Sequence, residues 1–136
     1  MIAIRTVSCF LVIAAYCGHA QLFGQEKKAD PRESLETAIP EAIRLLEAKD
    51  YRSLLKAFVA PEDLKKFSER GGFEDFVTKF SSRKAPSLLA TLNSIKGIKP
   101  TLKDEDRTAV FEFKEPIQGK TSITFVKIDK YWYLQN

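Results

Sequence analysis

The feature that most constrains the fold is the alternation of side chains in the C-terminal part of the chain. In Arg107–Lys114 every second residue is apolar, and the residues between them are mostly polar. This period of two, carried by aromatic and β-branched residues, is typical of a strand with one buried face. The buried face would carry Ala109, Phe111 and Phe113.

Two further strands are expected after this one. Thr121–Ile128 is rich in β-branched residues, Tyr131–Leu134 is almost wholly aromatic, and Asp129 and Lys130 between them predict a two-residue turn. Both strands carry apolar residues on their two faces. Helices can cover one face of such a sheet, whereas the other needs a partner subunit, a ligand or the curl of the sheet on itself.

The connections of the sheet carry weaker signals. Glu115–Lys120 contains Pro116 and Gly119, which predicts a longer hairpin connection between the first two strands. Ile98–Lys103 is a candidate for a fourth strand, which Pro100 would restrict to an edge of the sheet.

Helical periodicity precedes the sheet. Apolar residues recur at helical spacing from position 33 onward, and Pro40 either kinks the first helix or opens it as its first residue. Asp50 is a candidate N-cap for a second helix over Tyr51–Val59. Further boundaries between helices are expected at Pro61, at Gly71 and Gly72, before Pro86, and at Gly97.

Phenylalanines at helical spacing, at positions 73, 76 and 80, are more typical of a helix that covers a sheet than of a cofactor site. Helices followed by an antiparallel meander indicate the α+β class rather than alternating α/β. The expected architecture is therefore N-terminal helices packed on a curved antiparallel sheet of three to four strands.

The first twenty residues have the pattern of a secretory signal peptide. Met1–Arg5 carries a positive charge, Thr6–Cys17 is an apolar run, and small residues precede an expected cleavage after Ala20. The alternative is an uncleaved anchor, although a span needs about 20 apolar residues. Lipid attachment at Cys17 is disfavoured by the bulky Tyr16 before it. The pattern predicts a secreted or periplasmic protein with no membrane span after cleavage.

Cleavage would change the inventory of reactive side chains. Cys9, Cys17 and His19 all precede the cleavage site, so the exported chain would contain no cysteine and no histidine. Loss of Arg5 lowers the formal net charge from +4 to +3, a mixed surface that does not indicate nucleic-acid binding. We expect a flexible tether over residues 21–32 and a single domain over residues 33–136.

This inventory limits the chemistry. Without His or Cys there is no Ser-His-Asp or Cys-His system and no His/Cys zinc site, and the sequence contains neither glycine-rich phosphate motif. Asp104, Glu105 and Asp106 resemble a calcium loop only in charge, because its glycine and distal glutamate are missing, and they predict a turn. We expect no metal and no cofactor.

Two segments of the sequence suggest a family. An Ala-Lys-Asp-Tyr joint at Ala48–Tyr51, followed by a meander that ends in Phe125–Tyr133, resembles the NTF2-like (cystatin-like α+β) superfamily, in particular its small exported bacterial members of unassigned function. The resemblance covers about residues 33–136. It implies a cone in which helices and a curved sheet enclose a pocket. Enzymes, transport factors and plain binding modules share such a fold, so the fold does not choose among them.

The expected role is binding without catalysis, of a small apolar ligand or of a protein partner. Trp132 is expected in the core, and Tyr131 and Tyr133 on the opposite face, where they could line a partner surface or a homodimer. The candidate residues for a ligand or partner surface are the aromatic side chains Tyr51, Phe111, Phe113, Phe125, Tyr131, Trp132 and Tyr133.

Two alternatives stay open. A ketosteroid-isomerase-like enzyme would need a carboxylate base and tyrosine donors in an apolar pocket, for which Tyr51, Tyr131, Tyr133, Glu74 and Asp75 supply the residue types. The two acids lie in the first turn of an expected helix, where acids simply complement the helix dipole. The second alternative is a self-associating structural module.

Overall fold

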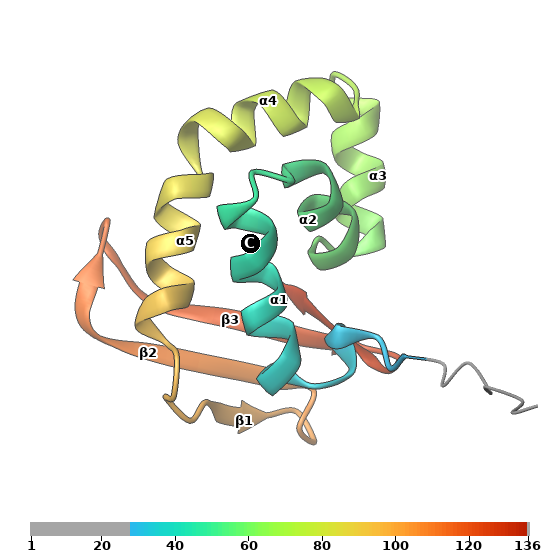
Figure 1. The fold of residues 1–136 in the computed structure, drawn as a ribbon. Helices are drawn as coiled ribbons and strands as arrows, with labels where there is room; N and C mark the ends of the chain where they lie inside the picture. The colour runs from blue at the N-terminus through green and yellow to red at the C-terminus, as the bar shows by residue number, and fades with distance from the viewer. Residues whose placement is uncertain (1–27, 136) are drawn as a thin grey trace, which may run out of the picture.

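A computed structural model describes residues 28–135, so the expected signal peptide, its cleavage after Ala20 and most of the tether lie outside the described residues. Within them five α-helices precede a four-stranded antiparallel sheet (Figure 1), which confirms the α+β class. None of the helices in this part of the chain is long and apolar enough to cross a membrane.

The helices begin and end close to the sequence signals. A 3₁₀ turn, η1 (Pro31–Glu33), precedes α1 (Leu35–Glu47), α2 (Tyr51–Phe58), α3 (Pro61–Glu69), α4 (Phe73–Arg83) and α5 (Ala85–Ser94). Asp50 caps α2, because its Oδ1 accepts a hydrogen bond from the backbone N–H of Ser53 at 3.2 Å. Gly72 has a φ of 85°, the left-handed region that favours glycine, and separates α3 from α4.

Pro40 lies in the interior of α1 and does not open it. Proline there removes one backbone hydrogen bond. The side chain of Pro40 is exposed, and its neighbours Ile39, Ala42 and Ile43 are buried and hold the helix against the core. Tertiary packing therefore outweighs the local cost of the proline.

The sheet is a meander in the order β1-β2-β3-β4, with β1 (Thr101–Lys103), β2 (Thr108–Ile117), β3 (Lys120–Ile128) and β4 (Tyr131–Leu134). The expected edge strand is present but shorter than Ile98–Lys103, because β1 begins immediately after Pro100. Asp129 and Lys130 form the predicted two-residue turn, since Ile128 pairs with Tyr131.

The expected long connection at Glu115–Lys120 is wrong. β2 continues to Ile117, which pairs with Lys120, so only Gln118 and Gly119 form the turn. Their φ values of 49° and 78° are both positive, as tight hairpin turns require. The register of β2 and β3 shifts between Glu112 and Ile117, an irregularity in the stretch that contains Pro116.

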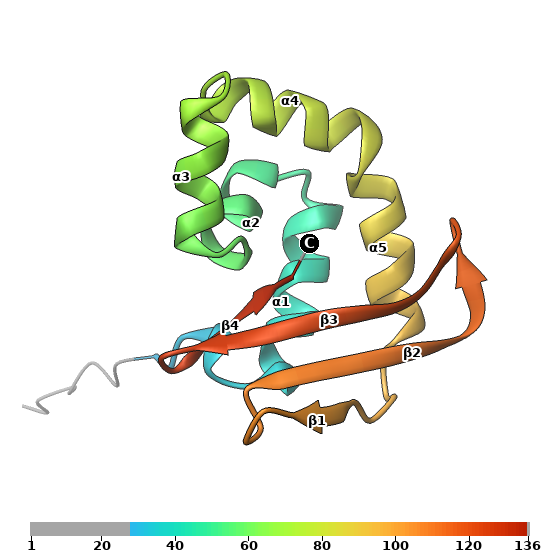
Figure 2. The ribbon, with the colours of Figure 1, turned by 180° about the vertical axis from the view of Figure 1, so that it is seen from behind.

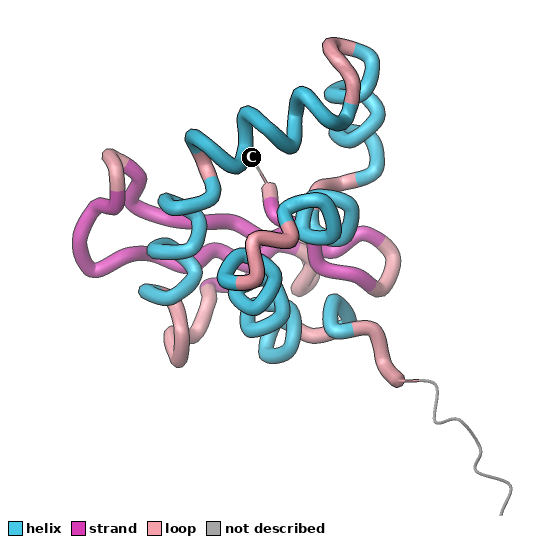
Figure 3. The backbone as a smooth tube through the Cα atoms, turned by 45° about the horizontal axis from the view of Figure 1, so that its top comes forward, coloured by secondary structure: helices cyan, strands magenta, loops and turns pink. Residues whose placement is uncertain are grey.

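The helices lie on one face of the sheet, and Figures 2 and 3 show the strands as a separate layer. Ala109, Phe111 and Phe125 are almost fully buried beneath the helices, and the rings of Phe111 and Phe125 meet edge to face at 5.8 Å. Trp132 is also part of this core. The core thus lies between one sheet face and the inner stripes of the helices.

The N-terminal turn is tied to the last strand. Arg32 was expected in a flexible tether, but η1 packs against β4, and Lys130 forms an ion pair with Glu33 at 3.1 Å. Val59, which follows α2, forms an isolated parallel bridge with Leu134. The folded unit therefore includes Arg32, and the free edge of β4 is partly covered.

Candidate functional site

The structure separates the predicted aromatic residues into distinct places. Phe111, Phe125 and Trp132 are buried in the core on the helix-covered face of the sheet, and Phe113 is half-buried there. Tyr51 is at the start of α2, where its ring meets that of Phe80 at 5.9 Å. These residues serve packing, and no single site brings all of the candidates together.

Tyr131 and Tyr133 lie on the opposite face, as the alternation along β4 predicts, but they are not free. The Arg32 guanidinium lies 4.4 Å from the ring centre of Tyr131 and 5.8 Å from that of Tyr133. Arg32 also donates to the carbonyl of Ala57 at 3.0 Å, and Tyr133 is only 7% exposed. The two tyrosines thus form a platform for the N-terminal turn.

Asp30 fixes the position of this arginine. Its carboxylate accepts hydrogen bonds from Nε of Arg32 at 2.9 Å and from a terminal nitrogen of Arg32 at 2.7 Å. These bonds hold the pKa of Asp30 below its usual value and raise the pKa of Arg32. A fixed, charged guanidinium can therefore lie flat over an aromatic ring at little further entropic cost.

The remaining part of this sheet face, which we call the outer face, lies opposite the helical layer (Figure 2). Cross-strand pairing aligns Thr101 with Val110, and Val110 with Thr124, and these side chains share one side of the sheet. Val126 is half-buried, and Ile128 is 40% exposed. The outer face comprises Thr101, Lys103, Thr108, Val110, Glu112, Ser122, Thr124, Val126 and Ile128.

The charged residues of the outer face lie toward its two ends, and by alternation along β3 Lys120 lies on the same side as Ser122, beyond the Glu112 end. Lys103 pairs with Thr108 at one end, and Glu112 pairs with Ser122 at the other. The residues between these ends are uncharged and mostly β-branched. Sequence reasoning showed that the strands have a second apolar face, but it missed the two charged ends because their placement depends on cross-strand register.

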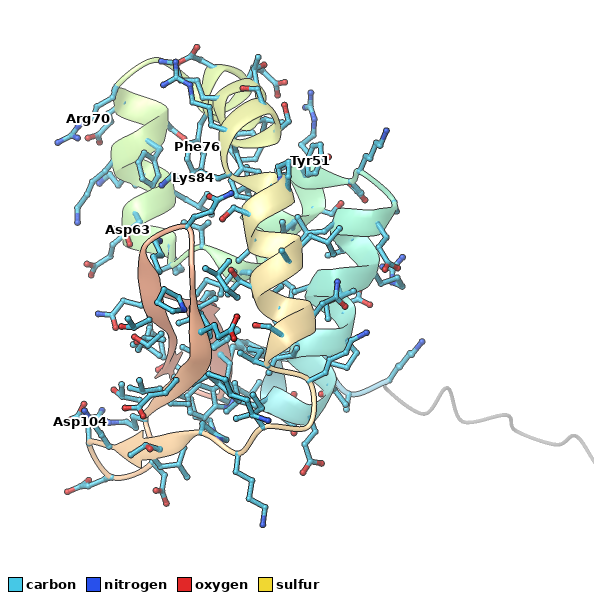
Figure 4. The ribbon with its side chains drawn as sticks, turned by 90° about the vertical axis from the view of Figure 1, so that its left-hand side faces the viewer. Tyr51, Asp63, Arg70, Phe76, Lys84 and Asp104 are labelled. Atoms are coloured by element: carbon cyan, nitrogen blue, oxygen red, sulfur yellow. The ribbon has the colours of Figure 1, made fainter. Side chains whose placement is uncertain are left out.

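The two acids named for the isomerase-like alternative are exposed and form ion pairs, Glu74 with Arg52 and Asp75 with Lys79 at 2.6 Å. Thr91 is the single buried polar or charged side chain in residues 28–135, so no carboxylate there faces a tyrosine in a buried pocket. Asp104, in the turn between β1 and β2, lies far from Tyr51 (Figure 4). Residues 28–135 therefore lack the arrangement that the isomerase-like alternative requires.

The acidic turn has a structural role. Asp104, Glu105 and Asp106 all have positive φ values, and Oδ2 of Asp104 accepts a hydrogen bond from the hydroxyl of Thr108 at 2.8 Å. Aspartate tolerates this left-handed conformation better than most residues. The predicted turn is confirmed, and the described residues contain no group of three or more His, Cys, Asp or Glu that could hold a metal.

Comparisons of the chain with protein-family models, with curated proteins and with solved structures find no match. The NTF2-like resemblance therefore stays a prediction. The outer face, with its charged ends, and the helix-covered face are the features from which a function has to be argued.

Proposed function

We propose that the protein is a non-catalytic binding domain whose outer face associates with a second copy of the same chain. The observation that carries the proposal is an uncovered sheet face with uncharged, β-branched residues in its middle and charged residues toward its ends, Lys103 at one end and Glu112 with Lys120 at the other. Such a face suits a second copy of itself, because Lys103 of one copy and Glu112 of the other complement each other under a two-fold rotation.

The geometry of the complementarity is simple. A two-fold axis that passes near Val110 and Thr124, perpendicular to the strands, reverses the strand direction in the second copy. Lys103 of one copy then lies over the end of the face that carries Glu112 in the other, and the converse pair forms by symmetry.

The size of the face is compatible with a weak dimer. Three strands about 4.8 Å apart and about seven residues with a rise of about 3.4 Å each give a projected area of roughly 350 Å². Standard interfaces bury about 800 Å² per partner. The middle of the face offers β-branched side chains, which pack face to face with little loss of side-chain entropy.

A charge-swap experiment tests the proposal by sedimentation velocity over a range of protein concentrations. Lys103→Glu or Glu112→Lys places like charges opposite each other twice per dimer, and we expect the dissociation constant to rise about tenfold. The double variant Lys103→Glu/Glu112→Lys restores opposite charges and should recover dimerisation. Recovery distinguishes a direct contact from a general effect of charge.

Matched controls lie on α3, within the helical layer. Lys65→Glu and Glu69→Lys make the same charge changes at exposed positions and should leave association unchanged. A wild-type protein that stays monomeric up to millimolar concentration contradicts the proposal. So does a double variant that associates no better than either single variant.

A further inference from the structure

A second candidate site lies on the helix-covered side of the sheet, apart from the outer face. It is an open groove of about 320 Å³ between the N-terminal half of α1, the connection from α5 to β1, and the ring of Phe111 on β2. Its apolar wall consists of Leu35, Ile39, Pro40, Ile95, Ile98, Pro100 and Phe111.

The end of β1 accounts for the position of the groove. β1 begins at Thr101, because Pro100 has no N–H with which to continue the pairing along β2. The chain instead reaches β1 through Gly97, whose φ of 75° lets it turn away from the end of α5. Beyond Val110, β2 is therefore no longer paired with β1. The connection from α5 lies next to Phe111 instead.

The apolar surface extends beyond the groove. In the register of β1 and β2, Leu102 is opposite Ala109, two positions along from Pro100 and on the same side of the sheet as Phe111. Its side chain is 47% exposed, the highest value among the large apolar residues of the described chain. An elongated apolar body could thus lie in the groove and continue over Leu102.

The polar residues of the groove are charged and lie at its rim. Lys96 and Lys99, both exposed, belong to the connection, and Glu36 lies opposite them in the first turn of α1. The three charges give the rim a net charge of one positive unit. An apolar wall with a few charged groups at its edge is typical of sites for amphipathic small molecules, and about 300 Å³ is the lower limit of their size.

We propose that this groove binds a small amphipathic carboxylate, with the apolar body against the half-buried Leu35 and Ile98 and the carboxylate at Lys96 and Lys99. The two lysines are separated by two residues across the Gly97 turn, so both ammonium groups can reach one anion at the rim. The volume of the groove, about 320 Å³, suits a single small molecule. This binding is independent of the self-association proposed above.

The test uses decanoate as the probe, below the concentration at which it forms micelles, with decanol and decyltrimethylammonium as its neutral and cationic counterparts. In ¹H-¹⁵N spectra of the purified protein, decanoate should shift the amide signals of Gly97, Ile98 and Phe111 saturably. We expect decanoate to bind at least about threefold more tightly than decanol, because contacts between exposed charges each contribute about 0.2–1 kcal/mol. The cationic probe should bind most weakly.

Two variants with matched controls locate the contact. Ile98→Glu places a negative charge in the apolar wall and should weaken decanoate binding at least about tenfold, whereas Ile128→Glu makes the same change on the outer face and should have no effect. The double variant Lys96→Gln/Lys99→Gln keeps the groove apolar. It should bring the affinity for decanoate down to that for decanol, and Lys65→Gln on α3 should not.

Three results would overturn the proposal. One is the absence of saturable shifts at the groove up to millimolar decanoate. Another is equal affinity for the anionic and cationic probes, which would indicate unspecific apolar contact. The third is an unchanged affinity in the double lysine variant, measured by titration of the same amide signals, which would remove the charged rim from the site.

Discussion

Arg32 makes more kinds of contact than any other side chain described above. Its guanidinium is paired with Asp30, lies over Tyr131 and donates to the carbonyl of Ala57. These contacts connect the N-terminal turn with the last strand and with α2. A single side chain therefore joins three segments that are distant in sequence.

We expect Arg32→Ala to lower the free energy of unfolding by about 1–3 kcal/mol at pH 7. The variant loses the cation–π contact and leaves the carbonyl of Ala57 without this donor. Urea denaturation measures the change. Arg44→Ala is the matched control, because Arg44 is exposed and pairs only with the nearby Glu41 through bonds typical of surface ion pairs. Equal losses in the two variants would contradict the special role of Arg32.

The contribution of Asp30 depends on pH. Its pKa is lowered in the folded state, chiefly by the hydrogen bond from Arg32, so the folded chain binds this proton less readily than the unfolded chain does. The stabilisation is therefore present above the unfolded pKa of about 3.9 and is lost as the pH falls through the lowered folded value. The difference between wild type and Arg32→Ala should accordingly shrink below about pH 4.

Among the helical elements, α3 depends most on one contact. None of its residues is buried, and its main contacts are with its neighbours α2 and α4. The ring of Phe67 in α3 stacks on that of Phe76 in α4, with 4.1 Å between the ring centres and an angle of 11°. The sequence places Phe76 among phenylalanines at helical spacing, but it cannot show that Phe76 stacks on Phe67.

We expect Phe76→Ala to release α3 without unfolding the sheet. Amide hydrogens of α3 should exchange at least about tenfold faster, because a stacked aromatic pair contributes about 0.5–1.5 kcal/mol beyond its buried area. Amides of β2 and β3 should keep their protection. Glu69→Ala, on the exposed side of α3, is the control. Equal acceleration in α3 and in the sheet would show that the two unfold together.

The elements themselves were largely predictable, because their signals are local. Alternation over Arg107–Lys114 and the turn residues Asp129 and Lys130 gave strands close to those observed. Of the two alternatives for Pro40, the structure excludes the one in which it opens the helix, and the sequence could not decide because packing of its buried neighbours is a tertiary effect. The hairpin at Gln118 and Gly119 was missed because a β-strand that contains Pro116 is uncommon and depends on a shift in register.

The candidate surfaces were less predictable than the elements, because they combine distant parts of the sequence. Glu33 and Lys130 are 97 positions apart, and no pattern within either segment indicates that they meet. Tyr133 was expected on a free surface, and its cover by Arg32 follows only from that contact. The groove likewise combines α1 with the connection before β1. Neither segment alone therefore indicates that Lys96 and Lys99 lie at the rim of a groove.

At the scale of the whole molecule, the helices and the sheet share one core. Trp132, the single tryptophan of the sequence, is buried where the last strand joins that core. Its fluorescence therefore reports the docking of the sheet, while the far-ultraviolet circular dichroism signal reports mainly the helices. We expect the two signals to change at the same urea concentration, as for a two-state domain of this size.

Addition of a reducing agent should not move this midpoint, because residues 28–135 contain no cysteine. A fluorescence transition at a lower urea concentration than the helical one would contradict a single cooperative unit. It would indicate that the meander leaves the helical layer first.

The attachment of η1 to β4 also has a consequence for synthesis. A ribosome releases the chain from its N-terminus at about 5–20 residues per second. Arg32 emerges early, but Tyr131 and Leu134, which hold the N-terminal turn and the end of α2, emerge last. Until then the N-terminal turn lacks its partners on β4, so this attachment is among the last to form during translation. A chain that must be threaded through a pore before it folds would benefit from such a delay.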